Sequence, residues 1–368
     1  MEENILKTEF IPVSDAMPGM IVASDIYTFN NILLIDKGAS LTDRVITRLM
    51  FYNIDEIEIV SSPDLDILSD NFDLDSLDTV SEEEKKVIAE FSKTTSECVS
   101  SFKASLSSTF VDNKELDTVQ LLDELNGLLT KTRNSFHLLS LLNIMKERDD
   151  VIFHHSINVA LLASMLGNMI HMDEKDLNTL KVGAILHDVG KLAIPQKILS
   201  NANKLNEKDF AVVQTHPNKG FDLLSKQDVP AVIKNIALQH HERCDGSGYP
   251  NGLTSKDIDK YAKIIAIVDC YEAMTSPRTY RGIINPFEVI EFFESEGYRL
   301  FDPEYMVPFI NGIVDSYVNK KVVLSDNSKG TIVLINKMAL SRPMIKLDSG
   351  SFVDLYQERK LSIIKVLI

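Results

Sequence analysis

Histidine and aspartate residues recur in a fixed order along apolar helical segments of this 368-residue chain, and no other feature constrains its fold as much. Five of the eight histidines belong to this series. Its members are His155, His187, Asp188, His216, His240, His241 and Asp269. A neutral imidazole or an ionised carboxylate is costly to bury without a partner, whereas nitrogen and oxygen donors gathered in an apolar setting are what a metal site requires. The series therefore predicts a metal site. The alternative is a set of unrelated core histidines that each need a separate explanation.

The segment around this series has the apolar spacing of helices. Apolar residues at intervals of three and four predict helices over 119–129, 136–145, 152–169, 173–187, 207–215, 221–224, 231–240, 262–274, 286–293 and 303–318. Members of the series fall at or near the ends of these helices, which is typical of a bundle that holds ligands between facing helices. We therefore expect a mainly α fold: a helical bundle with a small N-terminal α+β module and a small C-terminal β module.

The two ends of the chain show a different periodicity. Short β-like runs at 20–23, 32–35 and 56–60, with an amphipathic stretch at 42–51, indicate the N-terminal module. Runs at 331–335, 344–347, 352–355 and 362–367, separated by turn residues, indicate the C-terminal module. The expected divisions are 1–62 for the N-terminal module, 63–118 for an acidic linker and connecting helix, 119–320 for the helical domain that carries the series, and 321–368 for the C-terminal module.

The charge of the chain excludes some classes of partner. A net charge of −16 and a pI near 5.0 argue against the extended basic face that a long nucleic acid requires. Nine acidic residues between Asp64 and Glu84, with no basic residue among them, place much of this charge in the linker. A small anionic ligand remains compatible with basic residues near the series.

The sequence also carries information about its compartment. Three cysteines in separate segments form no disulfide framework, so we expect a reducing, cytoplasmic environment. The first residues lack a signal-peptide pattern, and no uninterrupted apolar stretch of about 18 residues occurs, so we expect no membrane span.

Apolar residues from Val87 to Leu106 recur with helical spacing and predict a long connecting helix over 85–107. A long helix at a domain junction can pair with a copy of itself. Dimerisation through this helix and packing against the next domain are therefore both open.

Five stretches of the sequence together resemble one family. They are His155-Ser156, His187-Asp188-Val189-Gly190-Lys191, His216-Pro217, the run HHERCDGSGYP from His240 to Pro250, and the run VDCYEAMTS from Val268 to Ser276. With these motifs, residues 119–320 are similar to the HD-GYP family, whose members are metal-dependent phosphodiesterases that hydrolyse cyclic di-GMP. The run from His240 to Pro250 is the most specific part of the resemblance.

The resemblance implies an HD-type bundle with a binuclear metal centre. It implies that one metal ion is held by His155, His187, Asp188 and Asp269, and that the second is held by His216, His240 and His241 with Asp188 as the bridge. Mixed histidine and carboxylate ligands without thiolate favour iron or manganese over magnesium or structural zinc. Two cations about 3.5–4 Å apart lower the pKa of a shared water, so that a metal-bridging hydroxide is the expected nucleophile. The expected cofactors are therefore two transition-metal ions per chain.

Basic and glycine-rich residues near these motifs are the candidate substrate contacts. Lys191, close to the HD pair, can aim its ammonium at a phosphate oxygen; the alternative is a charge that complements a helix end. Arg278 and Arg281 match family positions that contact substrate phosphates, with ordinary surface arginines as the alternative. Gly248 permits close approach of the backbone, and Tyr249 offers a ring for a guanine.

Other polar residues beside the motifs receive lesser roles. Glu242 and Asp245 are expected to form hydrogen bonds to the metal-ligating side chains and so to orient them. Cys244 and Cys270 adjoin ligands but are interpreted as small core residues.

The resemblance implies hydrolysis of cyclic di-GMP to pGpG, with further cleavage to GMP left open. Some family members carry, four residues before the first ligand histidine, a glutamate that helps hold a third metal. This chain has Val151 at that position, so we expect two metals and pGpG as the main product. A receptor that binds the cyclic dinucleotide without turnover is the first alternative. The second is an HD-superfamily phosphohydrolase that acts on another nucleotide, such as cyclic GMP-AMP.

Overall fold

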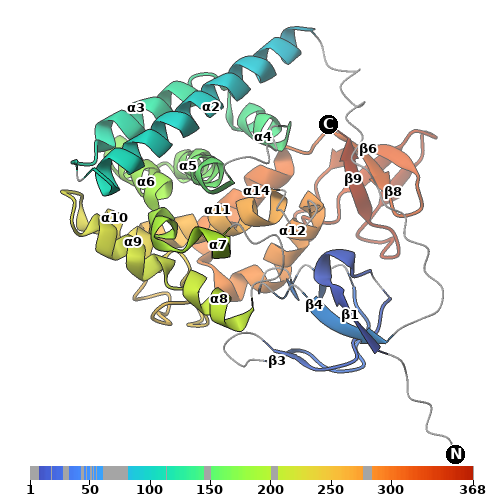
Figure 1. The fold of residues 1–368 in the computed structure, drawn as a ribbon. Coiled ribbons are helices and arrows are strands. Elements are labelled where there is room, and N and C mark those ends of the chain that lie inside the picture. The colour runs from blue at the N-terminus through green and yellow to red at the C-terminus, as the bar shows by residue number, and fades with distance from the viewer. Residues whose placement is uncertain are drawn as a thin grey trace, which may run out of the picture.

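A bundle of helices forms the centre of the computed structural model, and two small β modules lie beside it (Figure 1). The structure describes residues 8–17, 19–27, 33–42, 45–46, 48–49, 52, 54, 56–60, 82–112, 114–144, 151–199, 206–276 and 284–367. The expected mainly α fold with a small module at each end is confirmed.

Side-chain caps explain where many of the bundle helices begin. An Asp or Asn directly before the first helical residue accepts a backbone N–H of the first turn, which satisfies a donor that the helix itself leaves unpaired. Helices capped in this way are α3 (Thr118–Leu129), α6 (Glu174–Leu186), α8 (Glu207–Val213), α11 (Lys260–Thr275), α12 (Pro286–Phe292) and α14 (Pro303–Asp315).

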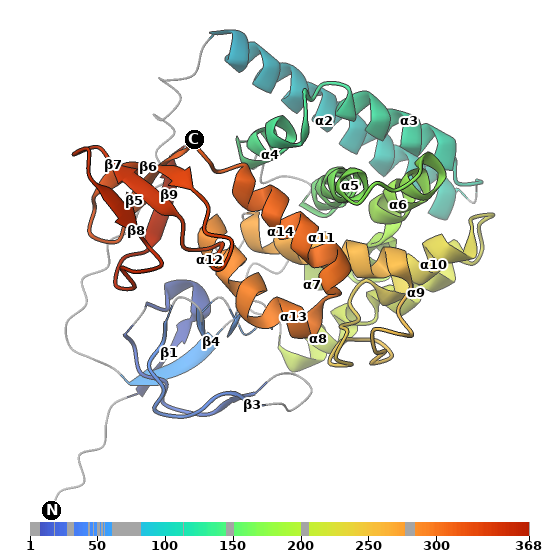
Figure 2. The ribbon, with the colours of Figure 1, turned by 180° about the vertical axis from the view of Figure 1, so that it is seen from behind.

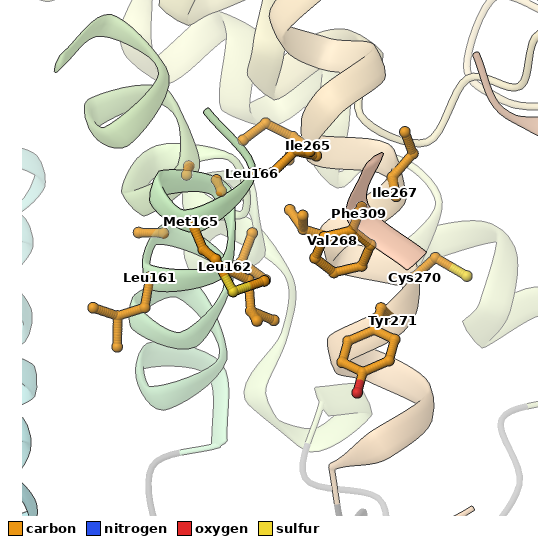
Figure 3. Close-up of a cluster of buried hydrophobic side chains, with 14 of the residues drawn as sticks. Leu161, Leu162, Met165, Leu166, Ile265, Ile267, Val268, Cys270, Tyr271 and Phe309 are labelled. Carbon is orange, nitrogen blue, oxygen red and sulfur yellow. The ribbon is translucent and has the colours of Figure 1, made fainter. Parts of the chain in front are cut away.

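The buried core of the bundle lies between α11, α14 and α5 (Val151–Met169). Figure 3 shows Leu162 and Leu166 of α5 opposite Val268 of α11 and Phe309 of α14, and each of these side chains is buried. Burying one such side chain contributes about 1.5–3 kcal/mol. Because α5 and α11 are apolar on nearly all sides, the few polar residues on them need a specific explanation.

The observed helices follow the predicted ones within a few residues, with one clear exception. Helix α9 (His216–Leu224) begins earlier than expected, with Pro217 in its first turn. Proline is favoured at that position because its missing N–H has no partner there in any case. The expectation that every member of the series lies near a helix end is wrong for Asp269, because α11 continues to Thr275.

The connecting helix is α2 (Glu82–Phe110), and it packs along α3 and α5 (Figure 1). Its apolar residues Phe91, Val99, Phe102 and Leu106 are buried in the core of the bundle. Packing against the next domain therefore accounts for the stripe, and dimerisation through 85–107 stays a prediction. Among the described residues, neither α2 nor another helix is long and apolar enough to cross a membrane.

The C-terminal module is one antiparallel sheet with the strand order β8-β7-β6-β5-β9. The strands are β5 (Lys321–Leu324), β6 (Lys329–Leu334), β7 (Met344–Leu347), β8 (Phe352–Asp354) and β9 (Ile363–Leu367). Strand β5 was not predicted, because its apolar run is only three residues long. The inner residues of the sheet belong to the same buried cluster as the helices, so the module is packed onto the bundle (Figure 2).

The N-terminal module consists of two short antiparallel pairs. Strand β1 (Thr8–Pro12) pairs with β4 (Glu56–Val60), and β2 (Ile26–Tyr27) pairs with β3 (Leu33–Ile35). The strand predicted at 20–23 forms only isolated bridges, Ile21 with Ser40 and Val22 with Ile59. Of the helix predicted at 42–51, residues 45–46 and 48–49 are helical, and residues 43–44, 47 and 50–51 lie outside the described residues. The module has a small core of its own.

Candidate metal centre

The seven members of the His/Asp series meet at one place between the helices. His155 lies on α5, His187 is the C-cap of α6 with Asp188 directly after it, and Asp269 lies on α11. His216 is the first residue of α9, and His240 is the C-cap of α10 (Ala231–Gln239), with His241 directly after it. His155, His187, Asp188, His216, His240 and Asp269 are at most 8% exposed.

Two glycines allow these helices to approach closely enough. A Cβ on Gly190, in the short helix η3 (Val189–Ala193), would overlap the carbonyl oxygen of His216. A Cβ on Gly183 of α6 would overlap the side chain of Ile236 on α10. Close contact of η3 with α9, and of α6 with α10, brings the HD pair next to the other histidines. The glycine of the HD-V-G-K motif therefore has a packing role that its sequence position alone did not reveal.

The first group of side chains surrounds one oxygen of Asp188. The Nε2 atoms of His155 and His187 each lie 3.5 Å from Asp188 Oδ2. Asp269 Oδ1 lies 3.0 Å from His155 Nε2 and 3.9 Å from His187 Nε2. Potential ligand atoms of His155, His187 and Asp188 lie within 4.8 Å of one another, which is close enough to share one cation.

The second group surrounds the other oxygen of Asp188. His216 Nε2 and His240 Nε2 lie 3.2 Å and 3.6 Å from Asp188 Oδ1. His241 completes this group, because potential ligand atoms of all four residues lie within 4.8 Å of one another. Asp188 belongs to both groups, so its two oxygens face two adjacent sites.

The hydrogen bonds made by Nδ1 of three histidines determine which ring nitrogen carries the proton. Nδ1 of His187 lies 2.7 Å from Ala184 O, Nδ1 of His216 lies 2.7 Å from Val213 O, and Nδ1 of His240 lies 3.0 Å from Ala237 O. A carbonyl oxygen can only accept, so each Nδ1 must donate. In the neutral imidazole, Nε2 then carries a lone pair, and all three Nε2 atoms point toward Asp188.

Without a cation this arrangement is unfavourable. His216 Nε2 and His240 Nε2 are 3.2 Å apart with lone pairs facing each other. His187 Nε2 and Asp188 Oδ1 are buried and have no hydrogen-bond partner among the described residues. Unpaired buried polar atoms are costly, and a cation between them would satisfy all of them at once. The donor set contains imidazole and carboxylate without thiolate, so the residues fit divalent metal ions.

The electrostatics of the centre favour the protonation states that metal binding needs. Burial lowers the pKa of His187 to about 4 and lowers the pKa values of His216 and His241. Burial would raise the pKa of Asp188, but Lys191 and the neighbouring histidines hold it well below its usual range. His155 is the exception: burial opposes its charge, yet Glu272 and Asp269 raise its pKa to about 9.

The candidate substrate residues lie around this centre as far as they are described. Lys191 Nζ contacts Asp188 Oδ2. The Tyr249 ring stacks on His241 at 4.7 Å between ring centroids, so one face of the tyrosine is already covered. A Cβ on Gly248 would overlap the backbone of Glu242 and Arg243, so this glycine is needed for packing within its own loop. Arg278 and Arg281 lie outside the described residues.

The expectation that Glu242 and Asp245 hydrogen-bond the metal ligands finds no support in their contacts. Glu242 accepts the backbone N–H groups of Asn251 and Leu253, at 2.7 Å and 2.9 Å, and so holds the loop that carries Tyr249. Asp245 accepts from Ser247 and from Arg299. Both residues brace the loop.

The residue that does support a candidate ligand is Glu272, which sequence reasoning missed. Its Oε2 lies 2.5 Å from His155 Nδ1. The sequence did contain one signal for this role. Glu272 comes three residues after Asp269 on an apolar helix, so the two carboxylates lie on the same side of that helix.

The chain is similar in sequence to several known proteins. Residues 139–305 match a family model described as HD domain. A cyclic di-GMP phosphodiesterase of Pseudomonas aeruginosa is 32% identical over 253 residues, covering 67% of this chain and 60% of the relative. A cyclic di-GMP phosphodiesterase of Thermotoga maritima is 35% identical over 50% of this chain and 52% of the relative.

One further curated relative and one solved structure are also similar to this chain. A 3'3'-cGAMP-specific phosphodiesterase of Vibrio cholerae is 35% identical over 45% of this chain and 32% of the relative. A solved HDG"Y"P protein from Bdellovibrio bacteriovorus covers 83% of this chain with a TM-score of 0.50 and 19% identity, which supports the fold alone. The chain spans 60% or less of the length of these three curated relatives.

Proposed function

We propose that this chain carries a domain of the HD-GYP family and that it is a metal-dependent phosphodiesterase that hydrolyses cyclic di-GMP to pGpG. The observation that carries the proposal is the convergence of three histidine Nε2 lone pairs on the two oxygens of one buried aspartate. The buried donor atoms of such a cluster are satisfied when cations bind between them.

We propose two transition-metal ions per chain, iron or manganese. His155, His187, Asp188 and Asp269 would hold the first, and His216, His240 and His241 would hold the second with Asp188 between them. The proposal rests on the two groups of donor atoms that share Asp188 and on the absence of thiolate from the donor set. The valine at position 151 offers no donor for a third ion.

A bound metal pair supplies a water of lowered pKa as nucleophile and neutralises negative charge that develops on the phosphate. The chain's own residues orient the substrate. Lys191 has 21% of its side chain exposed beside Asp188, so its ammonium can meet a phosphate oxygen at the centre. Arg278 and Arg281 are proposed to hold the phosphates, and Tyr249, in the loop held by Glu242, to contact a guanine.

A second substrate is supported by one specific observation. The similarity to a 3'3'-cGAMP-specific phosphodiesterase has the same percentage identity, 35%, as the similarity to the cyclic di-GMP enzyme of Thermotoga maritima. Cyclic GMP-AMP is therefore the alternative substrate, and both share the phosphodiester that the centre would cleave.

The experiment uses one anaerobically purified sample for metal analysis and for turnover of both cyclic dinucleotides, with products separated by chromatography. We expect two metals per chain and pGpG from cyclic di-GMP at a higher kcat/KM than for cyclic GMP-AMP. A fully metallated sample that binds cyclic di-GMP but forms no product over hours would instead identify a receptor.

We also propose the limits of the domains and the compartment of the protein. Residues 119–320 form the proposed catalytic domain, between the linker and connecting helix of 63–118 and the C-terminal module of 321–368, with the N-terminal module at 1–62. The three cysteines are free thiols, which supports the proposed cytoplasmic location.

A further inference from the structure

We propose that Glu272 is a positioning residue, which fixes the orientation and the proton of His155 so that the Nε2 of this histidine is available to the first metal. The inference rests on the proposed metal centre and assigns a role to a residue outside the candidate ligand set. It follows from three contacts that the Glu272 carboxylate makes with α5 and α11.

The first contact is with the candidate ligand itself. Glu272 Oε2 lies 2.5 Å from His155 Nδ1, and both side chains are buried. A carboxylate at this position keeps a proton on Nδ1 and increases the electron density on Nε2. Nε2 lies on the opposite side of the ring, 3.0 Å from Asp269 Oδ1 and 3.5 Å from Asp188 Oδ2.

The other two contacts hold Glu272 in place. Asn158 Nδ2 donates to Glu272 Oε1 at 3.0 Å, and Ser276 Oγ donates to the same oxygen at 2.7 Å. Asn158 is one helical turn beyond His155 on α5, and Ser276 caps the end of α11. The carboxylate is thus bound from both helices, and His155 is fixed relative to Asp269 on α11.

His155 is distinct from three other histidines in this respect. Nδ1 of His187, His216 and His240 each faces a backbone carbonyl of the histidine's own or preceding helical turn. A substitution at Glu272 should therefore change His155 and leave those three unchanged. This difference provides internal controls within one protein.

The test variant is Glu272→Gln, which preserves shape and removes the charge. An alanine would enlarge the pocket that Glu272 and Asn158 already line, so that a packing defect could not be distinguished from a loss of positioning. The matched control is Glu294→Gln. Glu294 also accepts several hydrogen bonds, from Leu340 N, Ser341 N and Ser341 Oγ, but contacts no histidine in its described interactions.

The probe metal is Zn²⁺, because it is diamagnetic and permits NMR of histidine-labelled protein. Compared at a pH where His155 is unprotonated in both proteins, we expect Glu272→Gln to weaken one of the two Zn²⁺ binding steps, the one at the site that includes His155, by about 10–100-fold, the range for an outer partner of a metal-bound histidine. The Nδ1–H resonance of His155 should shift while those of His187, His216 and His240 stay in place. Ser276→Ala should weaken the same step by a smaller factor, and Glu294→Gln should change neither readout.

The experiment distinguishes failure of the positioning role from failure of the proposed metal centre. Two-step Zn²⁺ binding that is unchanged in Glu272→Gln, or weakened equally in both steps, would overturn the positioning role and leave the proposed function intact. A wild-type chain that binds no Zn²⁺ would overturn both the positioning role and the metal centre.

Discussion

Asp188 is the residue on which the two candidate metal sites depend most. Each of its oxygens faces a different group of histidines, and the side chain is buried. We expect Asp188→Asn to weaken both metal-binding steps by more than the roughly 10–100-fold that an outer partner contributes, and to abolish turnover while helical circular dichroism persists. Asp222→Asn, at an exposed position on α9, is the matched control. Near-normal metal content in Asp188→Asn would argue against a shared bridge.

His155 makes metal binding dependent on pH in a defined direction. In the metal-free protein the carboxylates of Glu272 and Asp269 raise the pKa of His155 to about 9. A metal needs the unprotonated Nε2, so binding to the first site at pH 7 displaces about one proton. Affinity should therefore rise about tenfold per pH unit up to pH 9 and then level off. Calorimetric titration in buffers of different ionisation enthalpy measures the proton, and a value of zero would contradict this account.

At the scale of elements, the contact between η3 and α9 determines whether the two histidine groups meet. A Cβ on Gly190 would overlap the backbone of His216 and Gly220, which cannot move as a side chain can. We expect Gly190→Ala to lower the free energy of unfolding by about 1–3 kcal/mol, the range for overpacking, and to weaken metal binding at the site that includes His216.

Gly127→Ala is the natural comparison for this variant. Gly127 lies on α3, where a Cβ would meet no atom of the described residues within 4 Å. Alanine at such a helical position should raise the free energy of unfolding by about 0.4–1 kcal/mol. Chemical denaturation of both variants checks the pair, and a stable Gly190→Ala protein with normal metal affinity would show that the close contact is dispensable.

The predictability of these elements differed for physical reasons. Amphipathic periodicity and helix caps predicted the bundle well, because helices are specified by local sequence. Strand β5 was not predicted, and of the β1–β4 pair only β4 was predicted. A short strand is stabilised mainly by the strand that it pairs with, so its own sequence gives a weak signal. The ligand candidates were found because polar residues are conspicuous in apolar helices. The role of Glu272 was not predicted, because it depends on a contact between α5 and α11.

On the scale of the whole molecule, the two small modules differ in their dependence on the bundle. Val322, Leu324, Ile332 and Ile345 of the C-terminal sheet are fully buried in the same cluster as the helices. Glu294 on the short helix η4 (Phe293–Gly297) also accepts backbone N–H groups of Leu340 and Ser341. The N-terminal module instead has its own core and contacts η4 and α13 (Tyr298–Leu300) through Arg48 with Glu296 and Tyr52 with Arg299.

This difference predicts opposite results for two truncations. Each buried aliphatic side chain is worth about 1.5–3 kcal/mol, and a domain is stable by only about 5–15 kcal/mol. Removal of residues 321–368 should therefore unfold or aggregate the bundle, whereas removal of residues 1–60 should leave its thermal transition nearly unchanged. A stable, cooperatively folding 82–320 fragment would show that the sheet is not part of the bundle core.

The central claim is a binuclear centre that cleaves a cyclic dinucleotide. Its most direct test is metal content and cyclic di-GMP turnover measured on the same anaerobically purified full chain, before and after removal of metal by a chelator. We predict two iron or manganese ions per chain, formation of pGpG, loss of both on chelation, and recovery of both when metal is returned. Undiminished turnover in the metal-free chain, or three fully occupied metal sites in the native one, would contradict it.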